Sequence, residues 1–167
     1  MEGSASLLGK SANQFKQMIK YYETKNFKKA LKKSEDILER FPKHGETLSM
    51  KGLILNYLGK KVEAMTHAKM GLMSNLTSGM CWHTLGVIHK QERNYEEAMK
   101  CFVQAYNYDM DNGTIVRDLS LLQLQCRSFT EFKGTRFKVF QAKPNVQTNW
   151  IAYILALHLC SDHARAI

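Results

Sequence analysis

A pattern of residues that recurs at a fixed spacing constrains the fold of this chain more than any other feature of its sequence. The clearest copy consists of Trp82, Leu85, Gly86, Tyr95, Ala98, Phe102 and Ala105. Matching residues stand one unit earlier (Leu48, Gly52, Ala64, Ala68), two units earlier (Tyr21, Phe27, Ala30, Ile37), one unit later (Leu119, Phe129, Val139) and two units later (Trp150, Ala166). No insertion interrupts this spacing, which indicates an array of one repeated structural unit.

These residue types at a 34-residue period are typical of tetratricopeptide repeats, each of which is a pair of antiparallel helices. Small residues such as Gly52, Gly86 and Ala98 let the helix backbones approach, and bulky residues fill the remaining space. One helix pair cannot bury its own apolar face, so neighbouring pairs stack on each other. The sequence therefore predicts an all-α fold, a right-handed α-solenoid with four full repeats and a truncated fifth.

The repeat period also predicts where the elements begin and end. We expect a flexible N-terminus over residues 1–10, followed by an array over 11–167 with repeats at 11–44, 45–78, 79–112, 113–146 and 147–167. The expected helices span 12–24, 27–40, 46–58, 61–74, 80–92, 95–108, 114–126, 129–141 and 147–160. Because an array normally ends in a polar capping helix, we expect this chain to be a fragment of a longer array.

The sequence offers little to support catalysis, metal binding or membrane insertion. It has no Gly-rich phosphate loop, no Gly-x-Ser-x-Gly motif and no Cys-x2-Cys or His-x3-His pair, so we expect neither an enzyme nor a metal or cofactor site. Its 4 cysteines are too few and too scattered for a disulfide scaffold, and we expect them to be small buried hydrophobes. The longest apolar stretch, 150–160, is shorter than the ~20 residues that cross a bilayer.

Positive charge is concentrated near the N-terminus. The formal net charge is +9, and the segment from Lys10 to Lys33 contains eight lysines and a single acid, Glu23. A dense cationic surface attracts polyanions, nucleic acid above all, through contacts that depend on salt and not on base sequence. The alternative is a solvated lysine face that serves only solubility. The polyanion hypothesis assigns the contact to Lys16, Lys20, Lys25, Lys28, Lys29, Lys32 and Lys33.

The first helix of each predicted repeat lines a concave groove that suits a partner helix or peptide. This surface is mixed and largely apolar. In the second repeat we expect it to include Ser49, Leu53, Asn56 and Tyr57, in the third His83, Val87 and Lys90, and in the fourth Arg117, Leu121 and Leu124.

Several longer strings are more particular than the generic repeat. They are HGETLSMKG at 44–52, LGKK at 58–61, CWH at 81–83, RDLSLLQ at 117–123, NWI at 149–151 and ALHL at 156–159. In their order and spacing over residues 10–160, these strings resemble the N-terminal part of the auxiliary subunit of the NatA N-terminal acetyltransferase complex.

The resemblance implies a non-catalytic scaffold that supports a catalytic acetyltransferase subunit of the GNAT fold. It also implies docking on the ribosome, ribosomal RNA included, through a basic N-terminal surface, and hence a cytoplasmic, ribosome-associated protein without a cofactor, metal or membrane partner of its own. The lysine-rich segment fits this docking role, because ribosomal RNA is a polyanion. The alternative hypothesis is a free-standing adaptor that holds a partner peptide or helix in its groove.

Overall fold

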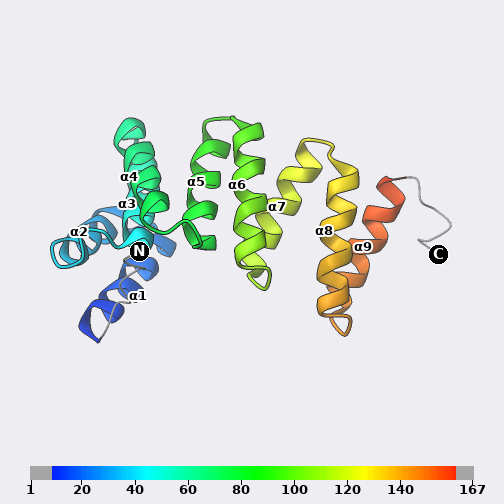
Figure 1. Ribbon diagram of the computed structural model, residues 1–167, viewed down its shortest axis with the longest axis horizontal. Coiled ribbons are helices and arrows are strands. Elements are labelled where there is room, and N and C mark those ends of the chain that lie inside the picture. The colour runs from blue at the N-terminus through cyan, green and yellow to red at the C-terminus, as the bar shows by residue number, and fades with distance from the viewer. Residues whose placement is uncertain (1–8, 161–167) are drawn as a thin grey trace. The chain divides into compact units, whose positions relative to one another are not determined.

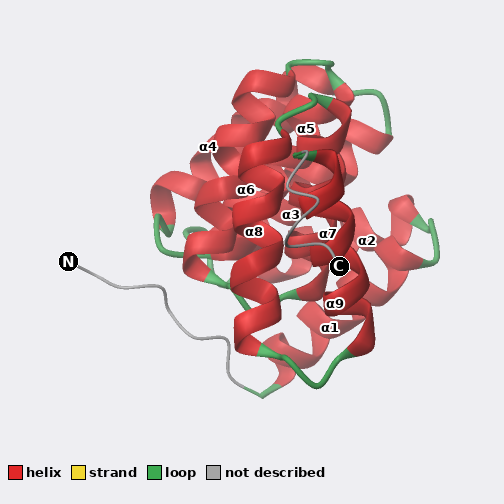
Figure 2. Ribbon diagram, turned by 90° about the vertical axis from the view of Figure 1, so that its right-hand side faces the viewer, coloured by secondary structure: helices red, strands yellow, loops and turns green. Residues whose placement is uncertain are grey.

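A computed structural model describes residues 9–160 of the chain, which form helices and connecting turns (Figures 1 and 2). The helices are α1 (Lys10–Glu23), α2 (Phe27–Leu38), α3 (Gly45–Tyr57), α4 (Lys61–Ser74), α5 (Gly79–Gln91), α6 (Tyr95–Tyr108), α7 (Gly113–Gln125), α8 (Phe129–Ala142) and α9 (Gln147–Leu159). The bounds of each lie close to those predicted, and the described residues contain no strand. The all-α class is thus confirmed, while the division into repeats stays a prediction.

The predicted flexible N-terminus and the truncated fifth repeat fall partly outside the described residues, and so does Ala166. Within 9–160, no helix is both long enough and apolar enough to cross a membrane. The chain divides into two compact units, unit 1 (Met1–Tyr108) and unit 2 (Asp109–Ile167).

The repeat period is visible in the backbone of the turns. Lys25, Gly59, Arg93 and Arg127 all have positive φ, between 57° and 83°. Each follows a helix and turns the chain back into the next one, the position where a left-handed residue ends a helix. Only Gly59 adopts this conformation without a steric cost, since the other three carry a Cβ.

Helix starts recur at the same period. His44, Ser78, Asn112 and Val146 are the N-cap residues of α3, α5, α7 and α9. The first three accept a hydrogen bond from a backbone N–H in the first turn of the helix, whereas valine has no acceptor to offer. Local chemistry that recurs once per repeat therefore helps to set where α3, α5 and α7 start.

In unit 1, helix α3 packs against α2, α4 and α5. Close approach depends on small residues, because a Cβ added at Gly52 would lie 2.7 Å from the carbonyl O of Ala64 and 2.8 Å from the backbone N of Ala68. Together with α1, these helices enclose an apolar core that includes Met18, Ile54 and Ile88. The tetratricopeptide pattern thus acts as predicted, with small residues where backbones meet and large ones between helices.

Unit 2 contains α7, α8 and α9, with α8 contacting both of the others. Phe132 fills the interior of unit 2. It stands at the position where the earlier repeats carry Ala30, Ala64 and Ala98. The buried amide of Gln123 on α7 donates a hydrogen bond of 3.0 Å to Thr135 Oγ1 on α8. On the other side of α8, Phe140 stacks on Tyr153 of α9 with ring centroids 5.6 Å apart.

Candidate functional site

The seven lysines predicted to contact a polyanion, here called the lysine surface, lie on α1, on the α1–α2 turn and on α2. All are exposed except Lys33, which is half-buried. Lys25 lies in the turn between the two helices, where its left-handed backbone follows the end of α1. The Lys16–Lys20 and Lys28–Lys32 pairs stand one helical turn apart on their helices, so each pair shares a helix face.

Two of these lysines are already engaged. Lys33 Nζ lies 3.2 Å from Asp36 Oδ2, and Lys29 Nζ lies 5.9 Å from the centre of the Tyr21 ring. Within residues 9–160, the other five have no ion-pair partner. Like charges one helical turn apart destabilise a helix by ~0.2–0.5 kcal/mol per pair, so an anion placed between them relieves a repulsion that the fold maintains.

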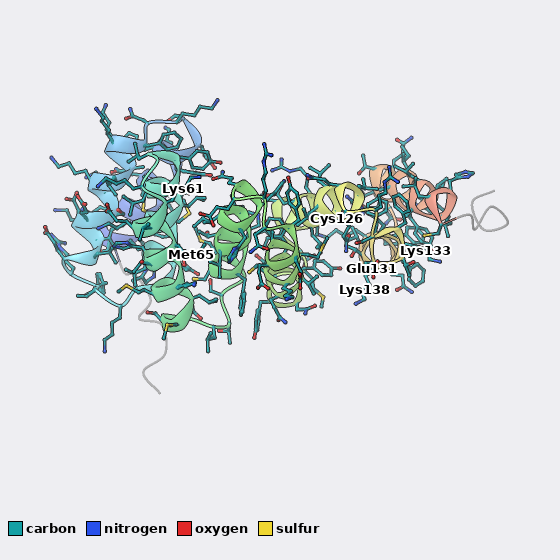
Figure 3. The ribbon with its side chains drawn as sticks, turned by 90° about the horizontal axis from the view of Figure 1, so that it is seen from above. Lys61, Met65, Cys126, Glu131, Lys133 and Lys138 are labelled. Carbon is teal, nitrogen blue, oxygen red and sulfur yellow. The ribbon has the colours of Figure 1, made fainter. Side chains whose placement is uncertain are left out.

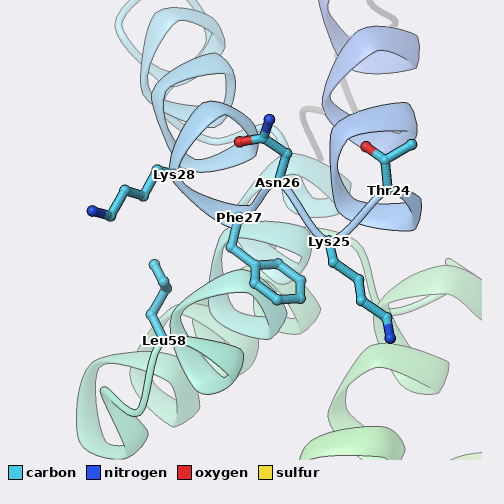
Figure 4. A pocket seen from close by; sticks show the side chains of 6 residues that line it. All are labelled: Thr24, Lys25, Asn26, Phe27, Lys28 and Leu58. Atoms are coloured by element: carbon cyan, nitrogen blue, oxygen red, sulfur yellow. The ribbon is translucent and has the colours of Figure 1, made fainter.

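A cleft of about 420 Å³ opens beside the α1–α2 turn, lined by Thr24, Lys25, Asn26, Phe27, Lys28 and Leu58. Figure 4 shows the Phe27 ring in the middle of this cleft, with the side chains of Lys25 and Lys28 on either side of it. The cleft combines two cations with an amide beside a partly buried aromatic ring, and its cations suit the phosphates of a nucleic acid.

Aromatic packing fixes the position of this turn. Phe27 stacks on Tyr57 at the end of α3, with ring centroids 5.0 Å apart and 9° between the planes. The centroid of the Tyr22 ring lies 6.0 Å from that of Phe27 and 5.7 Å from that of Tyr57. The Thr24 hydroxyl donates to the carbonyl O of Lys20 at 3.0 Å. The turn that carries Lys25 is therefore held against the end of α3.

Sequence reasoning missed the cleft residues other than Lys25 and Lys28. The turn that forms the cleft was indicated by the repeat, since Lys25 stands one repeat period before Gly59 and both have a left-handed backbone. That Leu58 reaches the same turn depends on the packing of α3 and could not be read from the sequence.

The predicted groove is only partly accessible in unit 1. Ser49 is 0% exposed and Leu53 is 5% exposed, so the prediction that these two residues contact a partner is corrected here. Ser49 lies where α3 meets Gly71 of α4, and a Cβ at Gly71 would collide with its Oγ. Leu53 belongs to the apolar core. Both face a neighbouring helix because α3 is surrounded by three of them.

The other groove residues of unit 1 stay candidates. Asn56 donates a hydrogen bond to Gln91 of α5, and Tyr57 is exposed at its edge while stacking on Phe27. His83 stacks on Phe102 with ring centroids 5.4 Å apart. Val87 and Lys90 are half-buried. Several of these side chains already hold neighbouring helices together.

In unit 2, the three predicted groove residues lie on α7. Leu121 is exposed and Leu124 is half-buried, whereas Arg117 Nε lies 3.4 Å from Asp118 Oδ1. An exposed leucine beside a half-buried one offers a small apolar contact surface.

The cysteines differ from the expectation of uniform burial. Cys81 and Cys101 are buried, and burial raises the pKa of both thiols, that of Cys101 to about 11. Cys160 is half-buried, and Cys126, at the end of α7, is exposed (Figure 3). It is exposed because it follows the last residue of the helix, beyond the packed face. Among the described residues, no three His, Cys, Asp or Glu side chains converge on a metal position.

A family model described as the N-terminal tetratricopeptide-repeat region of Psidin matches residues 14–164. The chain belongs to this family. This Psidin-type repeat region is 46% identical over 163 residues to the N-terminal acetyltransferase A complex auxiliary subunit NAA15 of Arabidopsis thaliana, covering 98% of the chain and 18% of that relative. It is 43% identical over 160 residues to N-alpha-acetyltransferase 16, NatA auxiliary subunit, of Homo sapiens, covering 95% of the chain and 18% of the relative.

Among solved structures, the Psidin-type region matches a chain from the structure of Naa15/Naa10 bound to HypK-THB. The TM-score is 0.86 at 38% identity, over 95% of this chain and 24% of that one. The resemblance to the NatA auxiliary subunit is confirmed by these relatives. The chain spans about a fifth of the length of the curated relatives it matches.

Proposed function

We propose that this chain is the N-terminal region of the non-catalytic auxiliary subunit of an N-terminal acetyltransferase A complex. The observation that carries the proposal is the 46% identity to such a subunit over 98% of the chain. The TM-score of 0.86 to a chain of the Naa15/Naa10 structure supports a scaffold role beside the catalytic subunit. Helical repeats suit this role, because stacked repeats present extended surfaces to a partner.

The lysine surface is the part of this region that docks the complex on the ribosome, by contact with ribosomal RNA. Five lysines without an ion-pair partner within residues 9–160 support this assignment, together with the cleft that Lys25 and Lys28 flank. Electrostatic contact with phosphates does not depend on base sequence. A cytoplasmic, ribosome-associated location follows from the same proposal.

The test is co-sedimentation of the chain with purified ribosomes over ~50 to ~200 mM salt. With about six phosphate contacts, the affinity falls by about 10³-fold across this range. The variant Lys16→Glu, Lys20→Glu, Lys28→Glu, Lys32→Glu removes four exposed lysines of the surface and is expected to lose most of this binding and its salt dependence. The matched control Lys43→Glu, Lys61→Glu, Lys69→Glu, Lys138→Glu makes the same charge change at exposed lysines elsewhere and is expected to retain most of it.

Two results would contradict the docking assignment. One is equal loss of binding in both variants, which would show that only net charge matters. The other is absence of binding by the unaltered chain at low salt. The docking function is separable from the support of catalysis: in a full-length auxiliary subunit with its catalytic partner, the lysine-surface variant is expected to leave acetylation of a short peptide unchanged.

The adaptor alternative requires a groove that is free to hold a peptide. In unit 1, Ser49 and Leu53 are buried, and Asn56 and Gln91 bond to each other. Few groups therefore remain for a ligand there, and we favour the docking function.

A further inference from the structure

The outer face of α4 carries an exposed apolar row, here called the α4 stripe. It consists of Val62, Thr66, Met70 and Met73, which share one side of the helix through their i, i+4, i+8 and i+11 spacing. Val62 is 83% exposed, Met73 79% and Met70 47%. Leu76, in the turn that follows α4, is exposed as well. The stripe is therefore an apolar surface that extends along most of the helix.

The opposite side of α4 is already used for packing. Ala64, Ala68 and Gly71 are buried, and Gly71 meets α3 at Ser49. The α4 stripe thus lies on the side of the helix that does not pack against α3, and within residues 9–160 nothing covers it.

The repeat provides an internal comparison for this face. One repeat earlier, on α2, the same four positions hold Lys28, Lys32, Asp36 and Glu39. One repeat later, on α6, they hold Glu96, Lys100, Gln104 and Asn107. The register-equivalent positions in α8 are Thr130, Gly134, Lys138 and Gln141. None of these positions holds a large apolar residue, whereas three of the four in α4 do, namely Val62, Met70 and Met73. The repeat fold therefore does not require large apolar residues at these positions of α4.

The charge along the edge of the stripe limits what can cover it. Lys61, Met65 and Lys69 form the next row of the helix, and Figure 3 shows Lys61 and Met65 one turn apart on α4. Lys61 and Lys69 have no ion-pair partner within residues 9–160. On the other edge, Glu63 is neutralised by Lys60 at 3.2 Å. The uncompensated charge beside the stripe is therefore positive.

We propose that the α4 stripe docks an amphipathic α-helix of another protein, whose apolar side carries Asp or Glu along the edge that meets Lys61 and Lys69. The spacing of the stripe matches that of helix-to-helix recognition, and flexible methionine side chains adapt to a partner surface. A second copy of this chain fits less well. A two-fold axis through the middle of the stripe would place Lys69 beside Lys69 of the other copy, and the two positive charges would repel each other. A membrane surface fits less well because the stripe has no Trp, Phe or Leu within the helix.

The experiment titrates the full chain with two synthetic helical peptides that have the same leucine stripe, one flanked by Glu and the other by Lys. We expect the Glu-flanked peptide to bind at least about tenfold more tightly than the Lys-flanked one. Its carboxylates attract Lys61 and Lys69, whereas the lysines of the other peptide repel them. Met73→Glu is expected to abolish its binding. The control Asn107→Glu, at the equivalent position on α6, is expected to leave it unchanged. Lys61→Glu with Lys69→Glu is expected to reverse the preference between the peptides.

Several outcomes would overturn this proposal. They are equal or absent binding of the two peptides, and binding that survives Met73→Glu. Self-association that Met73→Glu abolishes would assign the stripe to a second copy, and sedimentation with anionic phospholipid vesicles that the same variant abolishes would assign it to a membrane. Met73→Glu is expected to leave ribosome co-sedimentation intact, so this test is independent of the docking function proposed above.

Discussion

The ring of Phe27, the first residue of α2, lies nearly parallel to the ring of Tyr57, the last residue of α3, at 5.0 Å between centroids. This contact joins the turn that carries Lys25 to a helix of the following pair. It makes the geometry of the candidate docking cleft depend on the packing of α3.

Removing the Phe27 ring is expected to destabilise unit 1. Phe27→Ala should lower the free energy of unfolding by about 2 kcal/mol. This loss is smaller than for a fully buried phenylalanine, because the ring is half-buried. Urea unfolding followed by the fluorescence of Trp82, in a Trp150→Phe background, measures it. Tyr57→Phe keeps the stacked ring and should stay within about 0.5 kcal/mol of the parent. Equal losses in the two variants would contradict the stacking account.

Two helical glycines are expected to respond to alanine with opposite signs. A Cβ at Gly52 meets the backbone of α4 at 2.7 Å, so Gly52→Ala should destabilise the chain by about 1–3 kcal/mol. Gly134 on α8 has nothing within 4 Å of such a Cβ. Gly134→Ala should therefore stabilise by about 0.5–1 kcal/mol, by restricting the unfolded chain. Chemical denaturation read from Trp82 and Trp150 reports each change. A stabilising Gly52→Ala would refute the close-packing role of that glycine.

Acidification is expected to weaken the start of α3 through His44. Burial lowers the pKa of this histidine below 6.5, against a smaller opposing effect of Glu46. Its neutral Nδ1 lies 3.2 Å from the Thr47 backbone N and accepts its hydrogen bond, which a protonated ring cannot do. Because the folded-state pKa is the lower one, the stability contribution is complete above the unfolded pKa and is lost as the pH falls from about 6.5 toward the folded-state value.

The matched variant is His44→Asn, which keeps a capping acceptor but does not titrate. We expect its free energy of unfolding to fall less than that of the parent between about pH 7.5 and about pH 5.0. Asparagine also lacks the imidazole ring that contacts the edge of Phe15, and this loss should lower the free energy of unfolding of the variant equally at both pH values. Parallel pH profiles for parent and variant would exclude His44 as the titrating group.

The four thiols are expected to react at different rates. Cys126 is exposed and should be alkylated first by iodoacetamide under native conditions. Cys81 and Cys101 should react only after unfolding, because they are buried and their raised pKa values leave little thiolate. Mass spectrometry of peptides from a timed reaction distinguishes the sites. Rapid native labelling of Cys101 would show that the α5–α6 packing opens in solution.

Much of the fold could be predicted from the sequence because it depends on local chemistry repeated at a fixed period. Helix bounds follow from residues such as the N-caps Ser78 and Asn112 and the turn glycine Gly59, each of which acts on the backbone next to it. The lysine surface was visible for the same reason: lysines on short helices with few acids nearby remain in solvent wherever those helices pack. The family resemblance rested on the same strings and was confirmed by the relatives.

The tertiary structure decided which side chains are accessible. The sequence placed Ser49 and Leu53 in a groove, but the crossing of α3 with its neighbours buries both. It treated Cys126 as a core residue, although the end of α7 leaves it in solvent. The cleft around Phe27 and the exposed α4 stripe also appear only once the helices are packed. Periodicity assigns a residue to one side of its helix, whereas the angles and distances between helices determine what covers that side.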